Sequence, residues 1–164
     1  MREEDIPYVV AWKNDSEIGR LVRGVPIETT IYQESQRFLR SLDRDDMVRL
    51  TICHKGSPIG FLILSDIDKL NAKASLGMVI GEKRFWNQGL GFETMVLLIN
   101  YLFFELGFNR LSLEVFEFNN RARGLYEKIG FKLEGRERQG LLIQENTYDI
   151  LHMGLLREEY RHKE

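Results

Sequence analysis

The chain has 164 residues, a formal net charge of −2 and an apolar fraction of 43%. This length and composition are typical of a single globular domain, residues 1–164, that can bury a substantial core. The near-neutral charge argues against nucleic acid or a membrane surface as a partner, and the single cysteine excludes a disulfide framework or a cysteine metal cluster. The absence of a leader-like segment and of a membrane-spanning apolar run favours a cytoplasmic location.

Two short helices are predicted first. Asp5 is a candidate N-cap for a helix that fades at Asn14-Asp15 and carries apolar residues on one face. After a loop around Gly24-Val25-Pro26, Thr30 and Gln33 form the pattern of a capping box. The helix that follows has apolar residues at helical spacing, namely Ile31, Phe38, Leu39 and Leu42. Neither helix carries recognisable chemistry, so both are expected to serve as a cover for the rest of the fold.

From Met47 the apolar residues recur with a period of two, which predicts β-strands. A strand that begins there is joined by a turn at Lys55-Gly56 to a second strand, Ile59 to Leu64. A polar turn from Asp66 to Asn71 leads into a third strand, Ala72 to Ile80. These three strands are expected to form an antiparallel meander.

The second half of the chain alternates helices and strands. A strongly apolar helix from Leu90 to Leu106 is expected to be central and largely buried. A strand around Leu111 to Val115 and a helix capped by Asn119 follow. The last two strands are expected at Phe131 to Arg138 and Thr147 to Leu155, joined by residues 140–146. This order predicts an α/β protein with a mixed, mostly antiparallel sheet.

The residues between the third strand and the apolar helix suggest a phosphate cradle. Gly89 and Gly91 stand in a turn that leads from the strand directly into the N-terminus of the helix. The free N–H groups of a first helical turn point toward a ligand, and the helix dipole favours negative charge there. Glycine allows the backbone to approach closely, so the turn predicts binding of a phosphorylated cofactor.

Two motifs together resemble the GNAT N-acetyltransferase superfamily: Trp86-Asn87-Gln88-Gly89-Leu90-Gly91, and Asn119-x-x-Ala122-x-x-Leu125-Tyr126-Glu127-Lys128-x-Gly130-Phe131. The similarity is greatest to the branch of ribosomal-protein (Rim-type) and polyamine acetyltransferases, which carries an aromatic residue where Trp86 stands. The resemblance implies a GNAT fold, with a central sheet splayed in the middle and about four flanking helices. It also implies acetyl-CoA as the donor, a primary amine as the acceptor and no metal.

The resemblance further implies roles for individual residues. Tyr126 matches the residue that protonates the departing thiolate, and the strand backbone at Met78 to Ile80 would pair with the pantetheine arm. The expected cofactor-binding residues are Met78, Val79, Ile80, Trp86, Asn87, Gln88, Gly89, Leu90, Gly91, Phe92, Asn119, Ala122 and Tyr126. A hydroxyl donor fits a thiol leaving group with a pKa of about 8.5.

The general base is left open by the sequence. Relatives often carry glutamate where this chain has Ser75, and serine alone is not a base at neutral pH. Asp149, which matches an acidic position of the family's last strand, Glu82 and Glu114 are the candidates. Relatives often have Gly-Lys at the position of Asn87-Gln88, so the turn of this chain lacks the positive charge of that lysine. Lys83 or Arg84 is expected to supply it.

Other features leave alternatives. Cys53 is expected to be a buried thiol rather than a nucleophile, which favours direct transfer in a ternary complex. The apolar run Leu141 to Ile143 suggests a wall of the acceptor site or a subunit contact, as in a homodimer. The expected acceptor is a small amine or a protein N-terminal α-amine, with a polyamine or an amine-bearing antibiotic as alternatives.

The competing class of function is a non-catalytic acyl-CoA-binding sensor or partner module. A strand that usually precedes the first helix in relatives is not evident in residues 1–4.

Overall fold

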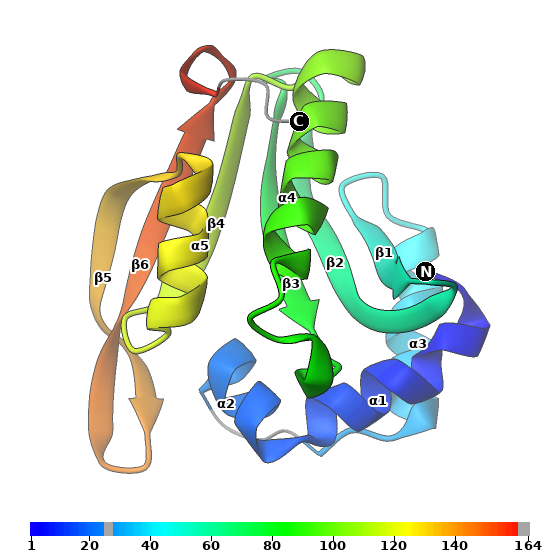
Figure 1. Ribbon diagram of the computed structural model, residues 1–164. Helices are drawn as coiled ribbons and strands as arrows, with labels where there is room; N and C mark the ends of the chain where they lie inside the picture. The colour runs from blue at the N-terminus through cyan, green and yellow to red at the C-terminus, as the bar shows by residue number, and fades with distance from the viewer. Residues whose placement is uncertain (25–27, 161–164) are drawn as a thin grey trace.

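The computed structural model describes residues 1–24 and 28–160. Its centre is a six-stranded sheet in the order β1-β2-β3-β4-β6-β5 (Figure 1). Neighbouring strands are antiparallel except β3 and β4, which are parallel, so the predicted mixed, mostly antiparallel sheet is confirmed. The strands are β1 (Val48–His54), β2 (Ser57–Asp68), β3 (Lys73–Ile80), β4 (Arg110–Phe116), β5 (Lys132–Ile143) and β6 (Asn146–Leu156).

Helices pack on both faces of this sheet (Figure 1). One face carries α4 (Leu90–Asn100) and α5 (Asn120–Ile129), and Leu62 of β2 belongs to the core cluster that these helices share with the sheet. Phe61, the preceding residue, points to the other face, where it packs with Trp12 and Ile18. The helices on that side are α1 (Ile6–Asn14), α2 (Ser16–Arg23) and α3 (Ile31–Leu42).

The sheet opens in its middle, as expected from the resemblance. The parallel strands β3 and β4 pair only where Lys73 to Ser75 face Arg110 to Ser112. Beyond Ser75 the two strands diverge, although β3 continues to Ile80 and β4 to Phe116. Five residues of β3 therefore have no strand partner on this side.

The N-terminal segment contains one more helix than predicted. Asp15, expected at the end of the first helix, instead caps α2: its Oδ1 accepts the N–H groups of Glu17 at 3.0 Å and Ile18 at 3.1 Å. Asp5 is the N-cap residue of α1, as predicted, but it makes no side-chain cap bond, and its carboxylate accepts from the Thr51 hydroxyl at 2.7 Å. The predicted loop extends over residues 25–27, which lie outside the described residues. No strand precedes α1 within the described residues.

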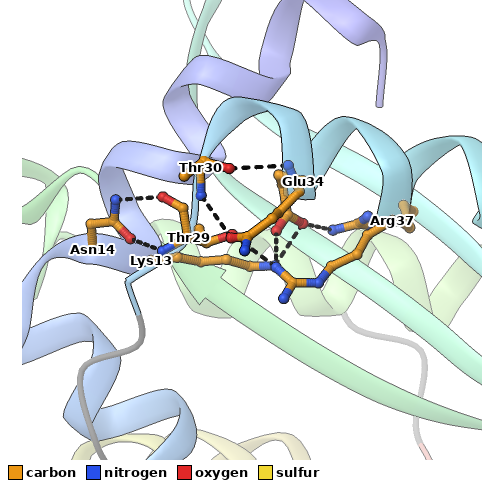
Figure 2. A network of polar contacts seen from close by, with 8 residues as sticks. Lys13, Asn14, Thr29, Thr30, Glu34 and Arg37 are labelled. Carbon is orange, nitrogen blue, oxygen red and sulfur yellow. Dashed lines mark hydrogen bonds and ion pairs between the residues drawn. The ribbon is translucent and has the colours of Figure 1, made fainter.

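A buried carboxylate ties α1, α3 and β1 together (Figure 2). The predicted capping box at the start of α3 is confirmed, because the Thr30 side chain accepts the Gln33 N–H. Glu34 follows one turn later, and only 1% of its side chain is exposed. Three cations reach this carboxylate, Lys13 and Arg49 at 2.7 Å and Arg37 at 2.9 Å. Burial alone would raise the pKa of Glu34, but the hydrogen bonds from Lys13, Arg49 and Arg37 outweigh burial and lower it to about 2.

The long apolar helix is only half buried. It continues from α4 into a π-helical turn, Tyr101–Glu105, in which the Leu106 N–H donates to the Tyr101 carbonyl five residues earlier. The sheet-facing side is fully buried, for example at Ile99 and Phe103. The expectation of a largely buried helix is therefore wrong, because the helix covers one face of the sheet and its outer side meets solvent. The exposed apolar residues on that side are Leu97, Phe104 and Leu106.

Two further expectations about strands need correction. The β5–β6 hairpin extends to Ile143, and its turn is Gln144-Glu145 rather than the longer predicted connection. The Leu141 side chain lies against Gly24 at the end of α2, where an added Cβ would meet it at 2.8 Å, so this apolar run packs partly within the chain. Cys53, expected to be buried, is exposed near the end of β1. Within the described residues, no helix has the length and apolarity that crossing a bilayer requires.

Candidate active site

The opening between β3 and β4 leads into a cavity of about 790 Å³. Its walls come from both layers of helices, because α2 lines one end and the α4 and α5 termini line the other. The cavity collects almost every residue that the resemblance implicates in cofactor binding; Gln88 is the exception, and its side-chain amide donates back to the Arg84 carbonyl. Residues far apart in sequence therefore form one site that passes through the sheet.

The backbone groups of β3 point alternately toward β2 and into the opening between β3 and β4. The Gly81 N–H donates to the Ile59 carbonyl of β2 at 2.8 Å, so Val79, two residues earlier, also directs its backbone groups toward β2. Met78 and Ile80 consequently direct theirs into the opening. The Ile80 carbonyl is already used, because the Trp86 indole N–H donates to it at 2.7 Å. Of the three backbone positions predicted to pair with an amide-rich ligand, only Met78 offers both groups in the opening.

The glycine turn has the conformation that a phosphate cradle requires. Gly89 is the N-cap of α4 with φ 82°, and Asn87 has φ 59°, so two left-handed residues bend the chain sharply into the helix. No side chain caps this helix, which leaves the N–H groups of its first turn available. Gly91 lies 3.4 Å from the Met78 side chain, measured from an added Cβ, so glycine keeps the first turn close to β3.

The cations expected to support this turn are engaged elsewhere. The Lys83 ammonium pairs with Asp15 at 2.8 Å and Glu17 at 3.0 Å, which ties the turn to α2. Arg84 lies 3.5 Å from Glu82, and neither Lys83 nor Arg84 lines the cavity. The cavity instead receives Arg121 and Lys128 from α5, which the sequence did not single out.

The first turn of α5 is fixed by its N-cap. The Asn119 Oδ1 accepts the Ala122 N–H at 3.2 Å, as its position in the motif predicts, and its Nδ2 donates to the Leu21 carbonyl of α2 at 3.4 Å. Asn119 thus links the helices on the two sides of the opening. Its side chain and Ala122 both border the cavity.

Tyr126 projects from α5 into the same cavity. The residue is 6% exposed, and burial raises the pKa of its phenol to about 12. The hydroxyl makes no hydrogen bond within the described residues, and it is not among the fully enclosed polar atoms, so it faces the cavity. Such a phenol remains protonated at neutral pH, so it can donate a proton or a hydrogen bond but cannot act as a base.

Among the candidate bases, the structure brings only Glu114 to the cavity. It extends from β4 on the α2 side and lines the cavity together with Ser75 and Asp66, and its Oε1 lies 3.4 Å from Nδ1 of His152. Asp66, at an irregularity of β2 with φ 51°, was missed because the sequence predicts only a polar turn there.

The other two candidate bases lie outside the cavity lining. Glu82 accepts the Trp12 indole N–H at 3.1 Å. Asp149 accepts the Gln139 N–H and the Arg136 guanidinium, each at 2.8 Å, and these bonds lower its pKa. Both carboxylates have structural partners, so the geometry does not support either as the base.

The α2 side of the cavity is largely apolar. Its wall is formed by α2 together with side chains that alternate along β2 and β4 on this face of the sheet. The apolar lining residues are Ile18, Leu21, Val22, Phe61, Ile63 and Phe116. A ligand on this side meets carboxylates near the sheet opening and apolar surface beyond them.

Comparison with known proteins identifies the architecture. The model of the acetyltransferase (GNAT) domain matches residues 1–132. The chain belongs to the GNAT acetyltransferase family. Its GNAT relatives include "Putative ribosomal N-acetyltransferase YdaF" of Bacillus subtilis, 33% identical over 66% of this chain and 59% of the relative. Spermidine N(1)-acetyltransferase of Escherichia coli is 22% identical over 98% of this chain and 85% of the relative.

A solved GNAT structure has the same fold. Spermidine N-acetyltransferase from Vibrio cholerae, in complex with CoA and spermine, superposes with a TM-score of 0.88. The match covers 98% of this chain and 94% of that chain at 19% sequence identity. The matched family model and the two relatives confirm the resemblance to the GNAT family and its Rim-type and polyamine-like branch. This family uses acetyl-CoA.

Proposed function

We propose that this protein transfers the acetyl group of acetyl-CoA directly to a primary amine bound on the α2 side of the sheet opening. The observation that carries the proposal is the single cavity that runs through the opening, with the Tyr126 phenol on one side and the Glu114 carboxylate on the other. A donor and an acceptor can meet there without a covalent enzyme intermediate. Cys53, the only cysteine, lies outside the cavity lining.

The chemistry follows from the two sides. Glu114, directly or through water, takes a proton from the ammonium of the acceptor, and the free amine attacks the thioester carbonyl. Negative charge on the carbonyl oxygen is stabilised by a β3 N–H directed into the opening, at Met78 or Ile80. The C–S bond breaks as the C–N bond becomes an amide, and Tyr126 donates to the leaving sulfur. The ammonium loses two protons in all. The first passes to Glu114 and from there to solvent, and the second, lost from the nitrogen after attack, balances the proton that the thiol gains.

The acceptor end favours an amine with one ammonium group and an apolar body. Among the described residues that line it, the wall is apolar beyond Glu114 and Asp66, so these residues offer no row of carboxylates for a long polycation. Deprotonation at neutral pH costs on the order of 4 kcal/mol for an alkyl amine but only about 1 kcal/mol for an α-amine. We therefore place α-amines of peptides with apolar first residues, and small monoamines, ahead of polyamines.

The test is an acceptor panel with acetyl-CoA and release of free thiol as the readout. We expect turnover with α-amine peptides and apolar monoamines, and kcat/KM for spermidine at least about tenfold lower. If spermidine is the best acceptor, the assignment of the acceptor class is wrong. If CoA binds but no amine releases thiol, the protein is an acyl-CoA-binding module and the enzymatic proposal fails.

Replacing Glu114 with glutamine should lower kcat/KM by about 10²-fold, because a neutral amide cannot accept the proton. The loss should be larger for an alkyl amine than for an α-amine, since the α-amine needs less help to deprotonate. Glu105→Gln, the same change at an exposed site outside the cavity, is the control and should leave the rates unaffected. Equal rates for Glu114→Gln and the native protein would eliminate Glu114 as the base.

A further inference from the structure

The phosphate end of the cavity lacks a cation from its own turn. Lys83 is held by Asp15 and Glu17, and Arg84 lies beside Glu82. CoA carries a diphosphate and a ribose 3′-phosphate, and helix N–H groups supply only partial positive charge. A cofactor with this charge gains most where a full cation lies beside the turn.

Arg121 is positioned to be that cation. It lies in the first turn of α5 and lines the cavity, and its guanidinium carbon is 3.7 Å from the centroid of the Trp86 ring. Trp86 is itself fixed by its indole bond to the Ile80 carbonyl. Trp86 comes shortly before the glycine turn in the chain, and Trp86 and Arg121 line the same cavity as Gly89 and Gly91.

The donors of Arg121 are not used within the protein. Across residues 1–24 and 28–160, its guanidinium makes no hydrogen bond and no ion pair. The acid that acts on it through space, Glu17, is already bonded to Lys83. Contact with the indole occupies the face of the guanidinium and leaves the N–H groups in its plane able to bind two oxygens of one phosphate.

We propose that Arg121, held on Trp86, is the phosphate-binding cation of this site and replaces the basic residue that the glycine turn lacks. The proposal rests on the proposed function, because it assumes CoA as the cofactor. It assigns the cationic contribution to phosphate binding to α5 rather than to a side chain of the turn. Lys83, by contrast, serves to join the turn to α2.

Calorimetric titration of the full chain with CoA, dephospho-CoA and pantetheine tests this assignment. Arg121→Met keeps an apolar side chain near Trp86 and should weaken CoA binding by at least about tenfold. Pantetheine has no phosphate and should bind both proteins equally. Arg123→Met removes the same charge two residues away, where Arg123 pairs with Glu127 at 2.8 Å, and should bind CoA as the native protein does.

Dephospho-CoA shows which phosphate Arg121 contacts. If the effect of Arg121→Met disappears with this ligand, the partner is the 3′-phosphate; if it persists, the partner is the diphosphate. Either result supports the proposal. Arg121→Lys keeps the charge but not the planar pair of donors and should lose less affinity than Arg121→Met. Thermal unfolding of both variants shows whether each remains folded, and Arg121→Lys carries the test if the methionine variant does not.

Two results would overturn the proposal. One is unchanged CoA affinity in Arg121→Met, and the other is an equal loss for pantetheine, which would mean that Arg121 acts only by packing on Trp86. Loss of affinity on Lys83→Ala, with none on Arg121→Met, would return the role to the turn. If the native protein binds no CoA at all, it is the proposed function that fails.

Discussion

Tyr126→Phe is expected to lower kcat for acetyl transfer by about 10²- to 10³-fold, while the affinity for CoA stays nearly unchanged. The phenol has a pKa of about 12, above the value of about 8.5 for a thiol, so it stabilises the leaving sulfur by donation and stays protonated between turnovers. Phenylalanine preserves the packing of the ring but has no donor. Thiol release under saturating acetyl-CoA and acceptor measures the loss.

Tyr160→Phe provides a matched control for this variant. Tyr160 is also buried, at 5% exposure, and its hydroxyl donates to Asn100 at 3.0 Å, away from the cavity. Its substitution should change stability slightly and leave kcat unaffected. Full activity of Tyr126→Phe would remove the tyrosine from the mechanism, whereas lost CoA binding would show that the residue is structural.

Glu34→Gln is expected to destabilise the fold by about 3–5 kcal/mol, since it leaves buried cations without their counter-charge. The pKa of Glu34 falls from 4.5 to about 2 on folding, which corresponds to about 3 kcal/mol in favour of the folded state. Unfolding in urea gives the change in free energy. Glu127→Gln breaks the exposed pair with Arg123 and should cost no more than about 1 kcal/mol.

The pH dependence gives a second signature of this cluster. Because the folded pKa of Glu34 is lowered, its contribution is fully present above pH 4.5 and is lost as the pH falls toward 2. Burial lowers the pKa of Lys13, and without the carboxylate that pKa should fall further. Glu34→Gln should therefore regain stability as the pH rises toward 10.5, the ordinary pKa of a lysine. Similar free energies of unfolding for Glu34→Gln and Glu127→Gln would refute the role assigned to this cluster.

Local signals made much of the fold predictable. The capping box at Thr30 and the two-residue period of the meander act over a few residues, so the sequence alone specifies them. The helix α2 escaped prediction because it has eight residues with Gly19 in its middle, and its N-cap Asp15 also resembles the end of α1. The outer face of α4 was misjudged because a run of apolar residues does not say how many layers cover it.

The parts of the site that lie within one sequence motif could be predicted, and the parts formed by contacts between elements distant in sequence could not. The glycine turn follows from its place between a strand and a helix, and Tyr126 was implied by the resemblance to the GNAT motif. The structure brings both to one cavity. Arg121 meets Trp86 only through tertiary packing between α5 and the turn after β3, so no local pattern indicates the contact. Glu82 and Asp149 were candidates by chain position, but neighbouring side chains and backbone groups engage them.

Where β3 and β4 diverge, each strand has an unpaired edge in the middle of the sheet, whereas unpaired edges normally occur only at its two outer strands. A bound amide-bearing chain laid along the unpaired edge of β3 would complete the hydrogen-bond ladder there, much as an added strand does. The ligand would then be part of the scaffold, and its supply would stabilise the native form by mass action. Resistance to proteolysis in the cell would accordingly follow the level of the acyl donor as well as the intrinsic stability of the chain.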